Sequence, residues 1–280
     1  APIAKLLDDH AGDRISLRET SRGIRALFKD ARFPAELAEQ IKGAYAELSK
    51  RYNTDSADVA VRSSATAEDL PDASFAGQQE SFLNVSGGSD LLETMITCFS
   101  SLFTERAISY REQKGFAHAA VALSVGVQKM IRSDKGCSGV IFTIDTETGF
   151  PDVIVINAAY GLGETIVQGA VTPDEFRIFK PCLKQSEFTP IIQRKLGAKE
   201  IQMIYSVEGS DRVATIKTPE ADRSRYCITE AQVLQLARWA VEIEQHYGRA
   251  MDIEWALDGE TQEIFIVQAA LAAPSATLRG

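Results

Sequence analysis

The apolar positions near the start of the chain recur with a helical period. Leu37, Ile41, Tyr45 and Leu48 follow one another at spacings of three to four residues. Pro34 stands just ahead of them, where the first turn of a helix tolerates proline. The first fifty residues are therefore predicted to be helical.

Strand-like patterns and a further helix follow. Residues 58–61 form a short β-prone run, residues 63–79 form a long polar stretch that contains glycine, and residues 81–85 are strand-like. Residues 90–111 are predicted to form a helix, because Asp90 and Glu93 have the spacing of a capping box. This part of the chain should be rich in helices and loops.

From residue 120 onward the pattern predicts successive strands divided by Gly, Asp and Pro turns, at 121–131, 139–144, 152–157 and 174–179. A helix should begin with a capping box at Thr229 and end at Gly248. Two strands follow, at 251–257 and 263–268, and Asp258-Gly259 between them is a hairpin signal.

These elements predict a mixed α/β (α+β) chain of two lobes. A helical, loop-rich lobe is expected over residues 1–119 and a sheet-rich lobe over residues 120–268. The small-residue tail 269–280 is expected to be a linker or a non-native remnant. The length of 280 residues is enough to bury a sizeable core.

Composition and charge narrow the function classes. Apolar residues make up 45% of the chain and charged residues 25%, which is typical of a globular protein. The net charge of 30 − 39 = −9 argues against sequence-independent binding to nucleic acid or to an anionic membrane. Without a long apolar run or a secretory signal, and with four scattered cysteines, the chain is predicted to be cytoplasmic with reduced thiols.

Several catalytic patterns are missing from the sequence. The turn Gly161-Leu162-Gly163-Glu164 lacks the third glycine of a dinucleotide fingerprint, and there is no P-loop. A Ser-His-Asp hydrolase is poorly supported, because G-x-S-x-G is absent and the only histidines are His10, His118 and His246. No C-x-x-C pair indicates a structural zinc site.

Arg62 ends the first β-prone run and precedes a cluster of small hydroxyl residues at 63–66. Its planar, permanently charged fork suits phosphate oxygens, although an arginine at a strand end more often makes a surface ion pair. Residues 72–79 combine small residues, Gly77 and amides, as in a loop that brings backbone N–H groups close to a polyphosphate. An ordinary surface loop has the same composition, so both interpretations stay open.

The strand at 251–257 places two carboxylates on one face. Asp252, Glu254 and Ala256 share that face because side chains alternate along a strand, and the residues between them are apolar. Mg²⁺ favours hard oxygen ligands and usually binds through one or two carboxylates together with phosphates. Asp252 and Glu254 are therefore candidate Mg²⁺ ligands, and a solvated outer face is the alternative.

Gln268 ends a strand that is otherwise apolar. Alternation predicts that Ile264, Ile266 and Gln268 share one face and that Phe265 and Val267 share the other. A polar side chain at the end of such an apolar run is expected to contact a polar partner.

Residues 61–85 (VRSSATAEDLPDASFAGQQESFLNV) resemble the phosphoenolpyruvate synthases, also called pyruvate, water dikinases. Further stretches resemble the same enzymes in the same order, at 106–111, 138–140, 161–176 and 246–256. The resemblance covers nearly all of residues 15–268. The wider family includes pyruvate, phosphate dikinase and rifampin phosphotransferase.

The resemblance implies an ATP-grasp-like domain that binds ATP and Mg²⁺. In this family the arginine of Val-Arg-Ser-Ser contacts ATP phosphates, which implies a catalytic and nucleotide-binding role for Arg62. The glutamate of Asp-Ile-Glu-Trp handles Mg²⁺ and nucleotide, which implies Glu254 with Asp252 beside it. The glutamine of Ile-Val-Gln-Ala implies that Gln268 binds the nucleotide.

Two more nucleotide contacts are implied by the resemblance. Residues 125–130 resemble the hinge strand against which adenine lies, and Gln128 is the candidate residue there. The loop around Gly77 resembles the flap that covers the phosphates.

The sequence also departs from the family pattern. Relatives begin with a Gly-Gly-Lys-Asn-like motif whose lysine holds phosphate, and Lys5 does not match it. Relatives continue Ala-Arg-Pro-Glu-Thr after the glutamine, where this chain has Ala269-Ala270-Leu271. Neither the Thr-Ser-His phosphohistidine segment nor the pyruvate barrel is present, and His118 lies in a different context. The chain is expected to be a truncated N-terminal fragment.

For the full-length parent, the resemblance implies transfer of the β-phosphoryl of ATP to a histidine on another domain and then to pyruvate. Phosphoenolpyruvate, AMP and phosphate would be the products, and this domain would position and neutralise the polyphosphate. A rifampin-phosphotransferase-like ATP domain and a non-catalytic nucleotide-binding module stay open as alternative functions. A homodimer stays open as the oligomeric state. The isolated chain is expected to form no phosphoenolpyruvate and to bind ATP weakly.

Overall fold

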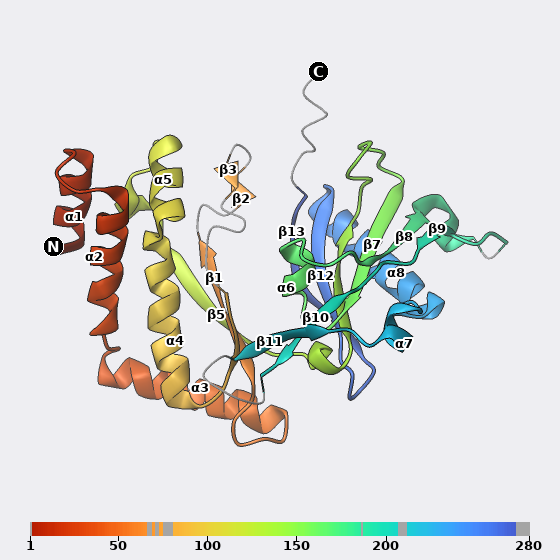
Figure 1. The fold of residues 1–280 in the computed structure, drawn as a ribbon, viewed down its shortest axis with the longest axis horizontal. Helices are drawn as coiled ribbons and strands as arrows, with labels where there is room; N and C mark the ends of the chain where they lie inside the picture. Colours follow the sequence, from red (N-terminus) through yellow and green to blue (C-terminus); the bar gives the residue numbers. More distant parts are fainter. Residues whose placement is uncertain are drawn as a thin grey trace. The chain divides into compact units, whose positions relative to one another are not determined.

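A computed structural model describes residues 2–65, 69–70, 73–74, 81–185, 187–206 and 212–272. The chain divides into two compact units, Ala1–Met130 and Ile131–Gly280, whose elements are labelled in Figure 1. Helices and sheets occur in both units, which confirms the predicted mixed α/β class. Within the described ranges, no helix is both long enough and apolar enough to cross a bilayer.

The helices of the first unit are α1 (Pro2–Ala11), α2 (Leu17–Lys29), α3 (Ala35–Arg51), α4 (Gly88–Ser100) and α5 (Glu105–Gln113). The α2 helix begins with a capping box, in which the Ser16 and Glu19 side chains each accept from the other residue's backbone N–H. Pro34 immediately precedes α3, as the helical period predicted. The prediction of a helical start is confirmed.

The single helix predicted over 90–111 is wrong. The α4 helix begins two residues earlier, after Gly87, whose φ of 93° is a conformation that favours glycine, and no capping box forms there. A short 3₁₀ turn, η1 (Ser101–Phe103), then separates α4 from α5. Thr104 caps α5 by accepting from the Ala107 N–H at 3.2 Å, so the chain restarts a helix where the sequence predicted continuity.

An antiparallel sheet forms the other half of the first unit. Its middle strand is β1 (Val59–Ala65), which pairs with β4 (Ser81–Val85) and with β5 (Leu123–Lys129). A separate small pair joins β2 (Asp69–Leu70) to β3 (Ala73–Ser74). One face of the three-stranded sheet packs on α3 and α4 through a buried cluster of Tyr45, Val59, Val61, Val85, Leu91, Met95 and Cys98.

The division between the units lies later than the predicted boundary at residues 119 and 120. Residues 121–131 were assigned to the sheet-rich lobe, but β5 pairs with β1 from Val59↔Lys129 to Ala65↔Leu123 and so belongs to the first unit. Alternation identifies a strand without identifying its partner, because pairing between distant segments is not a local property. The short 3₁₀ turn η2 (His118–Ala120) precedes this strand.

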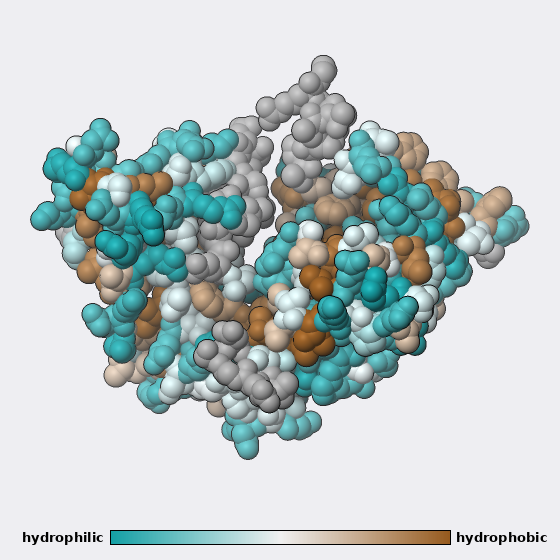
Figure 2. Space-filling view, in the orientation of Figure 1, coloured by the Kyte–Doolittle hydropathy of each residue, from teal (hydrophilic) through white to brown (hydrophobic). Residues whose placement is uncertain are grey.

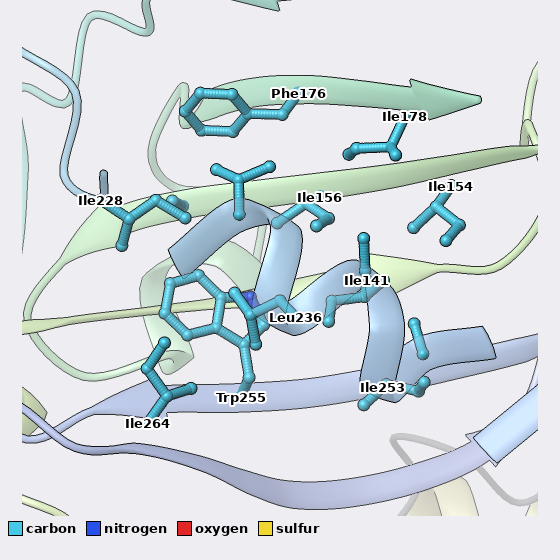
Figure 3. Close-up of a cluster of buried hydrophobic side chains, with 14 of the residues drawn as sticks. Ile141, Ile154, Ile156, Phe176, Ile178, Ile228, Leu236, Ile253, Trp255 and Ile264 are labelled. Carbon is cyan, nitrogen blue, oxygen red and sulfur yellow. The ribbon is translucent and has the colours of Figure 1, made fainter. Parts of the chain in front are cut away.

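The second unit is built on a six-stranded antiparallel sheet. Across the sheet the strands are β13 (Ile264–Leu271), β12 (Met251–Leu257), β6 (Cys137–Phe142), β7 (Val153–Tyr160), β8 (Asp174–Phe179) and β9 (Ile191–Lys195). The α8 helix (Glu230–Tyr247) packs on one face, where Leu236 meets buried side chains from the sheet such as Ile141, Ile156 and Trp255 (Figure 3). This packing leaves the opposite face of the sheet to carry polar residues.

Short elements connect these strands. They are η3 (Ser133–Lys135), α6 (Glu164–Val167), η4 (Lys180–Lys184), the paired strands β10 (Ile201–Tyr205) and β11 (Val213–Lys217), and α7 (Glu220–Arg223). The predicted capping box of α8 is confirmed, since Thr229 accepts from the Gln232 N–H and Gln232 from the Thr229 N–H. Gly248 ends α8 with a φ of 66°, as expected for a helix stop.

The final hairpin is confirmed, with a longer turn than a two-residue loop. Asp258 accepts from the backbone N–H groups of Glu260 and Thr261 at 2.8 and 3.0 Å. Gly259 is required by close approach, since a Cβ there would collide with the Lys135 carbonyl. Residues 269–271, expected in the tail, instead continue β13, because Ala269 and Leu271 pack on the core. Residues 273–280 lie outside the described part.

The surface shown in Figure 2 is mainly hydrophilic, with apolar residues in separate patches. Large exposed apolar side chains include Ile192 on the edge strand β9, which is 59% exposed. Scattered exposed apolar residues are normal for a folded protein.

Candidate functional site

The two predicted carboxylates lie on the sheet face opposite α8. Asp252 and Glu254 are half-buried, whereas Met251, Ile253 and Trp255 are buried in the core on the other side. The predicted alternation of β12 is therefore confirmed. Because β12 is regular along its whole pairing with β6, the two carboxylates occupy successive positions on one face.

Gln268 lies on the carboxylate face, and the prediction that it shares a face with Ile264 and Ile266 is wrong. The register changes from Trp255↔Ile266 to Glu254↔Gln268, so β13 has one residue more than β12 at this point. This β-bulge shifts the alternation by one residue. Gln268 is exposed and stands directly opposite Glu254.

The register brings Glu254 and Gln268 within reach of a common ligand. Directly opposite residues in an antiparallel pair have Cβ atoms about 4.5–5.5 Å apart, and both side chains are long enough to converge. On the other neighbour of β12, Val140 stands opposite Glu254 and Phe142 opposite Asp252. The face therefore combines the polar side chains of Asp252, Glu254 and Gln268 with apolar side chains beside them.

Asp252 has an unusual acidity. Burial first, and then the neighbouring charge of Glu254, together raise the pKa of its carboxyl to about 6. A cation bound between the two carboxylates would favour the charged form. No group of three or more His, Cys, Asp or Glu side chains in the described ranges is arranged as a metal site. A Mg²⁺ ion on this face would therefore need oxygen atoms from Gln268, phosphate or water as well.

We expect Asp252→Asn to stabilise the second unit at pH 8 by about 1–2 kcal/mol, after allowance for partial exposure. The pKa of Asp252 in the folded chain is raised above the ordinary value of 3.8. As pH rises from about 4 to 6, the unfolded chain releases this proton before the folded one does, so stability falls across that window.

Urea unfolding at pH 4 and pH 8 measures this difference, with Asp152→Asn, at an exposed position, as the matched control. An Asp252→Asn variant that gains nothing at pH 8 would contradict the raised pKa.

Arg62 and Gln128 share one face of the sheet in the first unit. Arg62 stands opposite Gly126 on β5, and Gln128 stands opposite Ala60 on β1, so the two are diagonal neighbours. Both are half-buried, and their face is the one opposite the buried Val59 and Val61. The structure thus brings together two predicted residues that are 66 positions apart in the sequence (128 − 62). Gly77 lies outside the described residues.

Sequence reasoning missed a charged cluster on the carboxylate-bearing face of the second unit. Arg177 on β8 contacts Asp145 at 2.8 Å, Glu175 at 3.0 Å and Glu147 at 3.2 Å. Three carboxylates around one guanidinium make this arginine part of an ion-pair network. Glu175 and Arg177 alternate with apolar residues in the strand, which is the signal that could have placed them on this face.

The resembling stretch 106–111 contains an arginine that supports the fold. Arg111 is 1% exposed, and its Nε donates to Nδ1 of His118 at 3.1 Å. Its Nη2 donates to the Leu102 carbonyl at 2.6 Å, and the guanidinium lies over the Phe103 ring. Burial, followed by the charge of Arg111, lowers the pKa of His118. His118 is therefore a neutral hydrogen-bond acceptor at physiological pH.

The resembling stretch 161–176 contains another buried charge. Asp174 forms an ion pair with Lys199, and both side chains are fully buried. Asp174 also accepts from the backbone N–H groups of Gly197 and Cys227, each at 2.9 Å. These bonds fix the start of β8 to two distant segments of the second unit.

Comparison with known proteins supports the predicted family. The profile of the family described as "Pyruvate phosphate dikinase, AMP/ATP-binding domain" matches residues 1–272. Phosphoenolpyruvate synthase of Aquifex aeolicus is 52% identical over 274 residues, covering 95% of this chain and 32% of that protein.

Two further relatives carry the same name. The phosphoenolpyruvate synthase of Synechocystis is 54% identical over 94% of this chain and 33% of its own length. That of Escherichia coli is 50% identical over 95% of this chain and 34% of its own length. The chain thus spans about a third of the length of these relatives. It belongs to the pyruvate phosphate dikinase AMP/ATP-binding domain family.

Proposed function

We propose that this chain binds ATP together with Mg²⁺ in an ATP-grasp-like domain. The observation that carries the proposal is the pairing of Glu254 with Gln268 across β12 and β13, with Asp252 on the same face. Family membership supports an adenine nucleotide as the ligand. The acidic face by itself would repel a polyphosphate, so a cation between them is part of the proposal.

The three residues on this face would hold the metal in different ways. Glu254 would supply a charged oxygen, and Gln268 a neutral carbonyl oxygen from the opposite strand. Asp252 would complete the set as a carboxylate, and the bound cation would lower its raised pKa, because the cation favours the charged form. The bound ion would neutralise phosphate charge, which is the main need in phosphoryl transfer.

Arg62 and Gln128 would bind the nucleotide on the sheet of the first unit. Arg62 would contact phosphate through two parallel N–H groups, and Gln128 would offer its amide to the adenine. Gly126, which stands opposite Arg62, has no side chain to cover that part of the face. The loop around Gly77 would cover the phosphates, as the resemblance implies.

We propose further that the parent protein is a pyruvate, water dikinase. ATP, pyruvate and water would give phosphoenolpyruvate, AMP and phosphate, with a phosphohistidine on another domain as the intermediate carrier. The names of the relatives support this reaction. The chain alone, which spans about a third of such a protein, is expected to form no phosphoenolpyruvate from ATP and pyruvate.

NMR of the side-chain amide of Gln268 tests the binding site directly. Addition of Mg²⁺ with ATP should shift this amide resonance, while either component alone should shift it much less, because metal and phosphates complete each other's coordination. Gln193, an exposed residue on β9, is the matched control and should not respond. Equal responses at Gln193 and Gln268 would refute a site at β12 and β13.

Arg62→Lys is expected to weaken ATP binding by about 1–2 kcal/mol while leaving adenosine binding nearly unchanged, because lysine keeps the charge but loses the two-pronged contact to phosphate. Calorimetry with both ligands measures the difference, and Arg18→Lys at an exposed position is the control. If adenosine binding falls as much as ATP binding, Arg62 supports the fold and has no phosphate contact.

A further inference from the structure

The β-bulge in β13 places two consecutive residues off the core. Ile266 and Ala269 pack against the core of the second unit, and the described core cluster includes neither of the two residues between them, Val267 and Gln268. A regular strand would turn one of any two neighbours toward the core. The bulge instead leaves both in the part of the strand that faces Glu254.

Neither the register nor the core requires the extra residue. If Val267 were deleted, Gln268 would follow Ile266 directly and would still stand opposite Glu254. Ala269 would still stand opposite Ile253, and the core-facing positions would alternate without interruption. The bulge therefore adds one side chain, Val267, to the face that carries the carboxylates, at the position beside Gln268.

Val267 adds a second apolar side chain next to the polar pair Glu254 and Gln268. Val267 is half-buried, and so is Val140, which lies across the other side of Glu254 on β6. A metal and its phosphates gain nothing from two valine side chains, because aliphatic groups neither donate nor accept hydrogen bonds. Apolar side chains next to a metal-binding pair suit a ligand that has apolar surface close to its charged groups.

We propose that Val267 is a specificity-determining residue that contacts the nucleoside part of the ligand held at Glu254 and Gln268. This inference rests on the proposed function, since it assumes that a nucleotide binds on this face. The chemical consequence is discrimination between nucleotides and bare inorganic polyphosphates, which offer the same oxygens but no apolar surface.

Calorimetry of the whole chain with Mg·ATP and with Mg·tripolyphosphate tests the proposal. Val267→Thr keeps the shape and exchanges a methyl group for a hydroxyl, so it should weaken Mg·ATP about fivefold and change Mg·tripolyphosphate less than about twofold. Deletion of Val267 should give the same selective loss, with an unchanged thermal midpoint as the check that the strand keeps its register. Ile192→Thr on β9 likewise exchanges an aliphatic group for a hydroxyl, here at an exposed site, and should change neither affinity.

Two outcomes would overturn the inference while leaving the proposed function standing. Equal losses for both ligands would place Val267 beside the phosphates or the metal, and unchanged affinities for both would remove it from the site. A wild-type chain that binds neither ligand would instead refute the proposed function, and this inference with it.

Discussion

Lys199→Met is expected to lower the free energy of unfolding of the second unit by about 3–5 kcal/mol. The Lys199 ammonium group is fully buried with the Asp174 carboxylate and also donates to the Gly197 carbonyl at 3.0 Å. Removing one partner leaves an uncompensated charge in a fully buried site, which is the costly way to break a buried ion pair. Lys199 also adopts a φ of 42°, rare for a residue with a side chain, so its contacts outweigh a local backbone preference.

Urea unfolding of the wild type and the variant measures this loss. Lys195→Met, at an exposed position on β9, is the matched control and should change stability by less than about 0.5 kcal/mol. Combining Lys199→Met with Asp174→Asn should recover part of the loss, because the unpaired charge is then gone. If Lys199→Met costs no more than the control, the pair does not anchor β8.

The elements that were predicted correctly are those whose sequence signals come from neighbouring residues. The strand β12 was predicted with the bounds that the structure shows, because alternation along 251–257 is uninterrupted. The α8 helix was likewise marked at both ends, by Thr229 and Gly248, whose capping chemistry requires only residues within one turn. Such signals are local in the sequence and can be found without knowing the fold.

The features that were missed depend on distant segments. The pairing of β5 with β1 joins distant segments. At the break between α4 and α5, the Phe103 carbonyl accepts a hydrogen bond from the Ser21 hydroxyl of α2, far away in the sequence. The bulge at Val267 is of the same kind, since "IFIVQAAL" reads as an uninterrupted strand until its register against β12 is known. A one-residue change of register therefore reversed the predicted face of Gln268.

The candidate site was found from the sequence only in part. The residues alone indicated two carboxylates on one strand face, Arg62 as a phosphate contact and Gln268 as a polar residue that expects a partner. The resemblance assigned their roles and added Gln128. The structure adds what neither could give, namely that Gln268 stands opposite Glu254 and that Arg62 and Gln128 share a face. The three-carboxylate cluster at Arg177 escaped notice because its members come from separate segments.

Glu254→Gln is expected to weaken binding of Mg·ATP by about 10- to 100-fold and to leave metal-free ATP unchanged or slightly improved. The lost charge acts on the ligand through the cation, so its removal matters only when the cation is present. Without the cation, the same carboxylate repels phosphate, and its replacement removes that repulsion. Calorimetry with and without Mg²⁺ measures both effects, and Glu263→Gln on the same hairpin is the control.

The Glu254→Gln variant also allows a second measurement, which needs no ligand. Glu254 raises the pKa of Asp252, although burial contributes more, so Glu254→Gln should lower the pKa of Asp252 below its value of about 6 without restoring it fully to 3.8. NMR titration of the Asp252 carboxyl carbon in the free chain measures this shift. An unchanged Asp252 pKa would show that the two carboxylates do not sense each other. Equal losses of ATP affinity with and without Mg²⁺ would show that Glu254 does not act through a metal.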